Sequence, residues 1–225
     1  NNSKGKEEDV IKIGYIGPPE DDKVTVQRIT GVSELQSKLY EVLNREKLDV
    51  VIHCMAVSDY TVDAVTTTAS LAESLMQKLQ LTESGVREGK QPFSDLLKQC
   101  LKQENLVAKG GKISSDSDGL LLALKRTPKI IDLFKVLQPQ TVLVGFKLLD
   151  HVPAGTLIEA GKQLMARSRC DFVLANDKAD VAEDRHKGYL IQPDGSFESI
   201  SGRQDIADRI VSCVTERLPE RGKPQ

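Results

Sequence analysis

Three predominantly apolar runs, separated by segments with helical periodicity, constrain the fold more than any other feature of this sequence. The runs lie at residues 48–57, 141–146 and 171–175. Strands that are apolar on both faces belong inside a parallel sheet that helices cover on each side. The intervening helical patterns lie at residues 33–43, 69–79, 93–101 and 156–167. The sequence therefore predicts an α/β fold with a three-layer, mostly parallel sheet and helices on both faces.

Further segments complete this prediction. Residues 10–16 have the alternation of another strand. Pro193-Asp194-Gly195-Ser196 separates two strand-like segments, and Asp-Gly is typical of a tight turn, so we expect a C-terminal β-hairpin before a last helix. The leucine-rich residues 120–136 are predicted to form a helix that Pro128 kinks or splits in two. The second half of the chain continues the pattern of the first, so residues 1–225 are predicted to form a single domain.

The composition excludes several classes of protein. The net charge is −2, and aromatic residues make up 4% with no tryptophan, which disfavours nucleic-acid binding. No apolar stretch approaches the roughly 20 residues that span a bilayer, and no signal-peptide pattern opens the chain. The four cysteines and three histidines are scattered, which is typical of reduced thiols and disfavours a resident metal site. We therefore predict a cytoplasmic protein that binds neither nucleic acid nor membranes.

Polar side chains follow all three apolar runs. These strand-end residues are Ser58, Asp59 and Tyr60 after the first run, Lys147 after the second, and Asn176 and Asp177 after the third. Asp and Asn also favour ordinary turns, so each group by itself is explained by a plain strand end. In parallel sheets, however, ligands bind beyond the carboxyl ends of the strands. Three such groups in one chain therefore favour a shared binding site.

Glycine and lysine residues add further candidates. Gly145 lies within the second run, where it marks either a close approach of a ligand or backbone, or a β-bulge or tight helix contact. Lys112 follows a diglycine and precedes two serines, which suits a phosphate group and equally an ordinary solvated loop. Residues 1–6 also carry glycine and lysine, and they could equally be a disordered tail. Neither glycine fingerprint for nucleotides, GxxxxGK[ST] or GxGxxG, is present, and no Ser-His-Asp pattern can be placed.

Five short motifs follow one another along the chain. They are AVSDY at 56–60, KISS at 112–115, LLLALKRTPKII at 120–131, VGFKL at 144–148 and DFVLAND at 171–177. Their order resembles the phosphopantothenate–cysteine ligase family in its free-standing bacterial form. The resemblance implies a Rossmann-like fold and a homodimer with active sites near the subunit interface. It also implies an enzyme of coenzyme A biosynthesis that joins 4′-phosphopantothenate to L-cysteine through an amide, using CTP and Mg²⁺.

The resemblance implies a mechanism and a nucleotide pocket. The substrate carboxylate would attack the α-phosphate of CTP, and the cysteine amine would open the resulting acyl-cytidylate. Asp59 would accept a hydrogen bond or make an outer contact to magnesium. The backbone of the G-F segment would lie against the cytosine ring. The residues assigned to the pocket are Ala56, Val57, Ser58, Asp59, Tyr60, Gly145, Phe146, Lys147, Asn176 and Asp177.

Four more residues would act in catalysis. Asn1 opens an N-x-S-x-G-K motif whose asparagine handles the acyl-cytidylate, and Lys112 matches a lysine expected to meet phosphate. The family also places a functional lysine in the helix before DFVLAND. Here Lys162 and Arg167 are both candidates, and neither is clearly in register. The opening strand and glycine-rich loop of the family have no counterpart before Asn1, and the helix after the asparagine motif has none either.

Two alternative functions share the predicted fold class. A non-catalytic nucleotide-binding module could retain the sheet without the first strand and helix of the family. An NAD(P)-dependent oxidoreductase would need a glycine fingerprint and a placed Tyr-x-x-x-Lys pair, and the sequence has neither. The choice of CTP over ATP rests on the resemblance alone.

Overall fold

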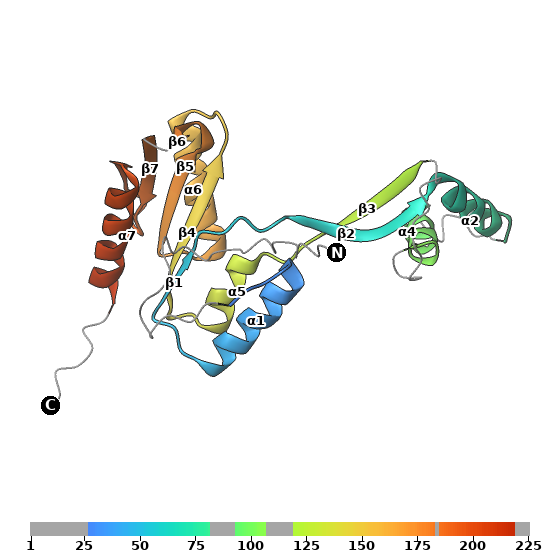
Figure 1. The fold of residues 1–225 in the computed structure, drawn as a ribbon, viewed down its shortest axis with the longest axis horizontal. Coiled ribbons are helices and arrows are strands. Elements are labelled where there is room, and N and C mark those ends of the chain that lie inside the picture. The colour runs from blue at the N-terminus through green and yellow to red at the C-terminus, as the bar shows by residue number, and fades with distance from the viewer. Residues whose placement is uncertain (1–26, 82–92, 107–118, 183–184, 219–225) are drawn as a thin grey trace, which may run out of the picture. The chain divides into compact units, whose positions relative to one another are not determined.

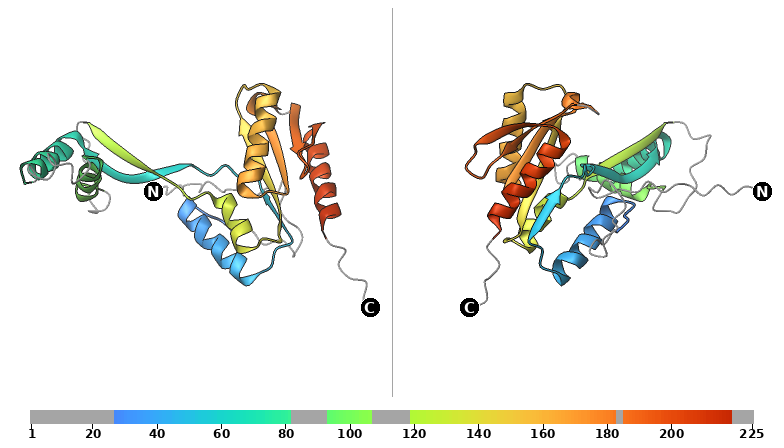
Figure 2. Two further views of the ribbon diagram at one scale, coloured as in Figure 1. Left: turned by 180° about the vertical axis from the view of Figure 1, so that it is seen from behind. Right: turned by 60° about the vertical axis from the view of Figure 1, so that its left-hand side comes forward.

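The structure, a computed structural model, describes residues 27–81, 93–106, 119–182 and 185–218. These residues belong to two compact units. Ser58–Pro128 form one, which we call the ribbon unit, and the chain before and after it forms the other, the three-layer unit. Figures 1 and 2 show the elements of each unit. Two compact units can belong to one domain, so the single domain over residues 1–225 stays a prediction.

Within the described residues, the sheet of the three-layer unit has six strands in the order β1-β4-β5-β7-β6, with β8 paired to β7. Three strands run parallel, namely β1 (Val50–His53), β4 (Val142–Leu149) and β5 (Phe172–Asp177). Three more extend the sheet with antiparallel pairing, namely β7 (Arg185–Ile191), β6 (Val181–Ala182) and β8 (Phe197–Ser201). The predicted C-terminal hairpin is therefore confirmed, and so is the α/β fold class.

Three helices cover one face of this sheet. They are α1 (Val32–Arg45), α5 (Ile130–Leu137) and α6 (Ala154–Ser168). Leu143 of β4 and Val173 of β5 point toward these helices and are completely buried in the resulting core. A strand of this sheet thus contributes every second side chain to one helical layer.

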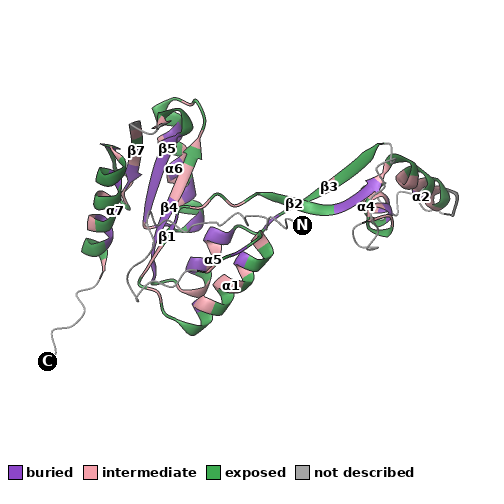
Figure 3. Ribbon diagram, in the orientation of Figure 1, coloured by how far each residue is buried: buried purple, intermediate pink, exposed green. Residues whose placement is uncertain are grey.

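Of the helices that the structure describes, α7 (Arg203–Arg217) alone covers the opposite face. Val144 and Leu174 are the next residues along the same strands, and they are buried against α7. Burial on both faces explains why the apolar runs lack a polar alternation. Figure 3 shows the central strands largely buried and the outer sides of the helices exposed. The three-layer arrangement with helices on both faces is confirmed.

The ribbon unit contains two strands and two helices in the described residues. They are β2 (Tyr60–Thr67), β3 (Leu120–Arg126), α2 (Thr68–Leu81) and α4 (Phe93–Gln103). The strands pair in antiparallel fashion, with Tyr60 opposite Arg126 and Thr67 opposite Leu120. Both helices lie where the sequence predicts them. No described helix combines the length and apolar character needed to cross a bilayer.

Two predicted elements are wrong. Residues 120–126 form strand β3 rather than the first half of a helix. Their backbone pairs with β2, and Pro128 disfavours helical geometry at the preceding Thr127, so α5 cannot extend backwards. Pro128 does separate two elements, because α5 follows it. The first apolar run ends as a strand at His53 rather than at residue 57. The predicted strand at residues 10–16 lies outside the described residues.

Candidate functional site

The carboxyl ends of β1, β4 and β5 meet at one edge of the sheet, which we call the carboxyl edge. The register places Leu148 of β4 beside Asn176 of β5. Phe146 and Lys147 lie in the second half of β4, and Asp177 is the last residue of β5. The structure therefore brings the polar residues after the second and third apolar runs to one edge of the sheet, with Lys147 and Asp177 on the side of α1, α5 and α6 and Asn176 on the side of α7. This is the position where parallel α/β sheets bind their ligands.

One side of the carboxyl edge is apolar and only partly covered. Alternation along the strands places Phe146, Leu148 and Asn176 on the side of α7, together with Ile52 of β1. Leu148 is 54% exposed and Ile52 is 43% exposed, whereas Asn176 is 8% exposed. We call these four residues the edge surface. An apolar patch that carries one amide suits the ring and the polar edge of a nucleotide base.

Gly145 lies on the other side of the sheet, toward the helices. A Cβ atom at Gly145 would lie 2.9 Å from Sγ of Cys170 and 3.3 Å from Cδ1 of Ile131. Burial raises the pKa of the Cys170 thiol to about 12, so this sulfur is a packed, unreactive group. The structure thus supports the packing interpretation of Gly145. Contact between its backbone and a cytosine ring stays a prediction.

Asp177 also points toward the helices, and its carboxylate is occupied by the protein. It accepts hydrogen bonds from the backbone N–H groups of Val152 at 2.8 Å, Ala179 at 2.8 Å and His151 at 3.0 Å. These bonds, the one from Val152 foremost, lower the pKa of the carboxyl group below its usual value. Among the described residues, the side-chain amide of the neighbouring Asn176 has no such partner. The two adjacent residues therefore differ in what they leave available to a ligand.

The positions of Ser58, Asp59 and Tyr60 correct the sequence prediction. Because β1 ends at His53, these residues do not follow a strand of the sheet, and Tyr60 instead begins β2 of the ribbon unit. The Ser58 hydroxyl donates to the Tyr60 carbonyl at 2.7 Å, and the N–H of Thr127 donates to the Asp59 carbonyl at 3.0 Å. Local pairing within the ribbon thus accounts for their backbone, and their contact with a nucleotide stays a prediction.

The predicted cations of α6 do not gather at the carboxyl edge. The helix leads from the end of β4 to the start of β5, so its last turn lies at the amino ends of the strands. Arg167 is roughly 20 Å along the axis from Ala154, and Lys162 is about 12 Å from it, at a rise of about 1.5 Å per residue. Their catalytic roles stay predictions that this placement disfavours. Asn1 and Lys112 lie outside the described residues.

His53 is a candidate that the sequence analysis missed. It is the last residue of β1 and is buried, with its ring centroid 5.8 Å from that of Phe134. Its Nδ1 atom is buried without a hydrogen-bond partner in the described part of the chain. Burial lowers the pKa of this imidazole. The available signal was a single polar residue inside the run VVIHCM. Beyond it, Ala56 is exposed and Val57 packs against the core.

A cavity of about 620 Å³ lies at the opposite, amino edge of the same sheet. Its wall contains Lys135, which is buried and donates to Asp171 and to the Thr141 carbonyl, both at 2.7 Å. Arg217 lies 3.6 Å from the same carboxylate. The buried charge is therefore paired within the protein. No predicted site residue is among the described residues that line this cavity.

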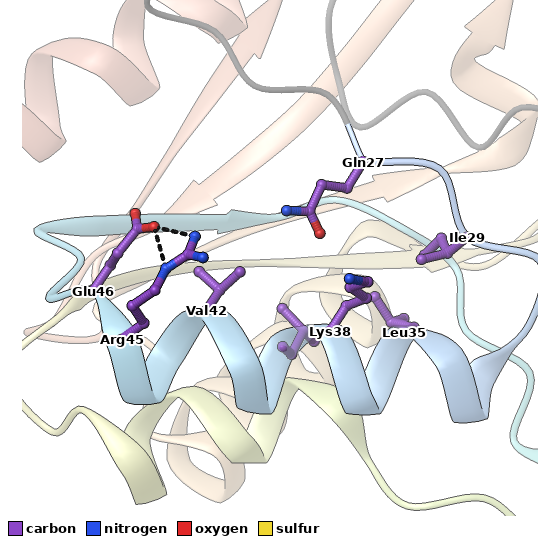
Figure 4. A pocket seen from close by; sticks show the side chains of 8 residues that line it. Gln27, Ile29, Leu35, Lys38, Val42, Arg45 and Glu46 are labelled. Carbon is purple, nitrogen blue, oxygen red and sulfur yellow. Dashed lines mark hydrogen bonds and ion pairs between the residues drawn. The ribbon is translucent and has the colours of Figure 1, made fainter.

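A smaller groove of about 310 Å³ runs along α1 (Figure 4). Its floor is apolar, with Ile29, Leu35 and Val42, and the Arg45–Glu46 ion pair lies at one end. Neither this groove nor the amino-edge cavity contains a cluster of metal-binding side chains. More widely, the described residues contain no group of three or more His, Cys, Asp or Glu side chains that could hold a metal ion.

A protein-family match and two curated relatives place this chain in the same family. Residues 104–218, which include β4 and β5, match the DNA/pantothenate metabolism flavoprotein C-terminal domain. Two curated relatives are the coenzyme A biosynthesis bifunctional proteins CoaBC of two archaea. That of Methanocaldococcus jannaschii is 32% identical over 107 residues, 46% of this chain and 26% of the relative. That of Thermococcus kodakarensis is 30% identical over 149 residues, 66% of this chain and 34% of the relative.

Solved structures show the same fold. The DNA/pantothenate metabolism flavoprotein from Streptococcus pneumoniae is 26% identical, with a TM-score of 0.67 over 89% of this chain and 76% of that one. The C-terminal domain of the coenzyme A biosynthesis bifunctional protein CoaBC is 14% identical, with a TM-score of 0.53 over 90% of this chain and 69% of that one. At that identity the likeness concerns the fold alone. The chain spans only 26% to 34% of the length of the curated relatives.

Proposed function

We propose, on the premise that this chain belongs to the family of the DNA/pantothenate metabolism flavoprotein C-terminal domain, that it is a phosphopantothenate–cysteine ligase of coenzyme A biosynthesis. The names of the curated relatives support this proposal for the part of their length that the chain spans. The finer proposal is that the enzyme depends on CTP and works through an acyl-cytidylate, as the five sequence motifs imply.

The edge surface is the observation that carries the proposal. Phe146 and Leu148 offer apolar side chains in the second half of β4, and Asn176 adds an amide with donors and an acceptor for the polar edge of a base. These residues come from the motifs VGFKL and DFVLAND. Folding therefore unites at one edge two motifs that lie apart in the sequence. Phe146 packs partly against the core, whereas the exposed side chain of Leu148 is not explained by packing within the unit.

The proposed reaction has two steps. A carboxylate oxygen of 4′-phosphopantothenate attacks the α-phosphorus of CTP, and the bond from that phosphorus to pyrophosphate breaks. The amine of L-cysteine then attacks the acyl carbon and loses a proton, while CMP leaves with the electron pair of the carbon–oxygen bond. Both steps depend on positioning and on neutralisation of phosphate charge, and neither needs a nucleophilic side chain.

We assign roles within this scheme from the residues that reach the carboxyl edge. Asn176 orients the base, and Lys147 contributes positive charge from the end of β4. Lys112 and Asn1 keep their proposed roles at phosphate and at the acyl-cytidylate, and Asp59 its proposed outer contact to magnesium. We place Mg²⁺ on the triphosphate as part of the substrate, which is how Mg²⁺ commonly reaches nucleotide sites.

The proposal is tested by omission of single substrates. Pyrophosphate release in large excess over enzyme should require 4′-phosphopantothenate, L-cysteine and CTP together, because without L-cysteine the first step releases no more than one pyrophosphate per site, and mass spectrometry should find the amide product. Binding of CTP without turnover would instead support a non-catalytic nucleotide-binding module. We expect Asn176→Ala to raise the KM for CTP about tenfold, the effect of one lost hydrogen bond to a ligand. Asn44→Ala, on the exposed side of α1, is the matched control and should leave KM unchanged.

We also propose that the protein is a cytoplasmic homodimer whose subunits meet at the ribbon unit. Lys125 lies on the other face of the ribbon from Leu122 and Leu124, and it forms an ion pair with Asp63 at 2.8 Å. A two-stranded ribbon is marginally stable by itself, and contiguous exposed apolar side chains are typical of interfaces. The apolar face consists of Tyr60, Val62, Leu122 and Leu124, which are 46% to 59% exposed.

A further inference from the structure

The carboxylate of Asp177 connects three segments around the carboxyl edge. Oδ2 accepts the N–H of Val152, and Oδ1 accepts the N–H groups of His151 and Ala179. The first two donors belong to the loop between β4 and α6. Ala179 belongs to the short 3-10 helix Lys178–Asp180, which directly follows β5. Hydrogen bonds to this one buried side chain thus connect the loop after β4 with the loop after β5.

The conformation of the loop between β4 and α6 depends on these hydrogen bonds to Asp177. His151 has a φ of 52°, in the left-handed region that disfavours residues with a Cβ atom. The helix that follows begins after Pro153 without any side-chain hydrogen bond to its first turn. The loop also continues directly from Leu148 and Leu149, so a change in its path displaces the end of β4. The hydrogen bonds from Asp177 therefore hold the shape of the edge surface from its far side.

The same bonds leave Asp177 little capacity for a ligand. An ionised carboxylate accepts about four hydrogen bonds, and the backbone already supplies three. Asn176 has its side chain on the opposite face of β5, within the edge surface. We propose that Asp177 is a positioning residue for the nucleotide site, and that Asn176 is the residue of this pair that contacts the nucleotide. This assignment rests on the proposed function.

The test separates positioning from contact with two measurements on the full chain. Amide hydrogen exchange reports whether the N–H groups of His151, Val152 and Ala179 stay protected. Calorimetry with CTP reports the affinity. For Asp177→Asn we expect exchange at these amides to become about tenfold faster and CTP affinity to fall about tenfold, as for loss of a capping interaction. For Asn176→Ala we expect a similar loss of affinity with unchanged exchange.

Asp194→Asn is the matched control. Asp194 lies in the exposed turn between β7 and β8 and accepts the N–H of Ser196 at 2.9 Å, in the same way that Asp177 accepts that of Ala179. Its replacement should speed exchange at Ser196 and leave CTP affinity unchanged. If CTP affinity fell as much in Asp194→Asn as in Asp177→Asn, loss of any such carboxylate would weaken CTP binding wherever it lies in the chain. That result would overturn the assignment.

A second-site change adds a readout that direct contact could not produce. Asn adopts the left-handed conformation routinely because its short polar side chain can hydrogen-bond locally. His151→Asn in the Asp177→Asn background should therefore raise CTP affinity about threefold. Lost affinity with unchanged exchange, or no recovery in the double variant, would overturn the assignment and make Asp177 a direct ligand. A wild-type protein that binds no CTP would remove the proposed function, while the exchange data would still decide whether Asp177 holds the loop.

Discussion

Strands β3 and β4 have similar apolar content and opposite environments. In β4, the sequence VLVGFKLL lies between two helical layers, and Leu143 and Val144 are completely buried. In β3, the sequence LLLALKR pairs with β2 alone among the described strands, and Leu122 and Leu124 are more than half exposed. The apolar residues of β4 are therefore buried within the subunit, whereas those of β3 form an exposed surface of the described unit. The difference lies in the neighbouring elements and not in the residues themselves.

This comparison separates two uses of apolar surface. Side chains of β4 stabilise the folded chain, since they leave water when the subunit folds. Side chains of β3 can be stabilising only when something outside the described unit covers them. We have proposed that a second copy of the chain does so. The four predictions that follow test this separation, from the largest expected effect to the smallest.

Truncation of matched leucines should give the largest contrast. Leu143→Ala removes a completely buried side chain and should lower the free energy of unfolding by about 3 kcal/mol. Leu122→Ala removes an exposed one and should lower it by less than about 0.5 kcal/mol in dilute, monomeric protein. Urea unfolding of both variants at low protein concentration measures the difference. Equal losses would show that β3 is as buried as β4 and would end the comparison.

Charge on the apolar face of the ribbon should act on assembly. Leu122→Lys and Leu124→Lys together place ammonium groups where the second copy would pack, so the dimer should weaken by about 2 kcal/mol or more. Sedimentation velocity over a concentration series measures the dissociation constant. Lys125→Gln, on the other face of the ribbon, is the control and should leave the dissociation constant within about threefold. An unchanged dimer in the double variant would exclude the ribbon as the interface.

Added volume at Gly145 should destabilise the three-layer unit. A methyl group there meets Cys170 Sγ at 2.9 Å, so Gly145→Ala should cost about 1–3 kcal/mol in unfolding free energy. Gly155→Ala in α6 is the control, because a Cβ atom there meets nothing within 4 Å. A helical alanine is favoured over glycine, so this variant should be neutral or more stable by up to about 1 kcal/mol. Stabilisation by Gly145→Ala together with destabilisation by Gly155→Ala would mean that the sheet and α6 are packed differently.

Buried His53 should add a small pH dependence to stability. Burial lowers its pKa in the folded protein, so the unfolded chain takes up a proton first as the pH falls below 6.5. The free energy of unfolding should therefore decrease below pH 6.5, by at most about 1.4 kcal/mol per pH unit, until the folded pKa is reached. His53→Phe should remove this contribution. The unfolding free energy of the wild type and of His53→Phe, measured from pH 8 to pH 5, gives the contribution of His53 as the difference between them. The same pH dependence in both proteins would contradict a buried neutral imidazole.

The central sheet and the family could be predicted because their signals are local. Continuous apolar runs indicated β4 and β5, and five ordered motifs indicated the family before any coordinates. The exposed strand β3 could not be predicted in the same way. Its leucines fit a helix as well as a strand, and only the distant partner β2 decides between them. Local propensity was overridden by pairing with a segment far away in the chain.

The candidate site was predictable in composition and not in geometry. The sequence placed Asn176 and Asp177 together after β5, but alternation within the strand turns them to opposite faces. It also grouped Ser58 to Tyr60 with them, because the run from residue 48 shows no sign that the strand ends at His53. Register and strand length depend on neighbouring strands, and these are the quantities that separate a ligand contact from a structural residue.

The most direct test of the account is the hydrogen-exchange footprint of CTP on the wild-type protein. Nucleotide binding at the carboxyl edge predicts slower exchange at the ends of β4 and β5, around Leu148 and Asn176, with no change around Lys135 and Asp171 at the amino edge. Protection centred on the amino-edge cavity, or bound CTP without protection at Leu148 and Asn176, would contradict the proposed site.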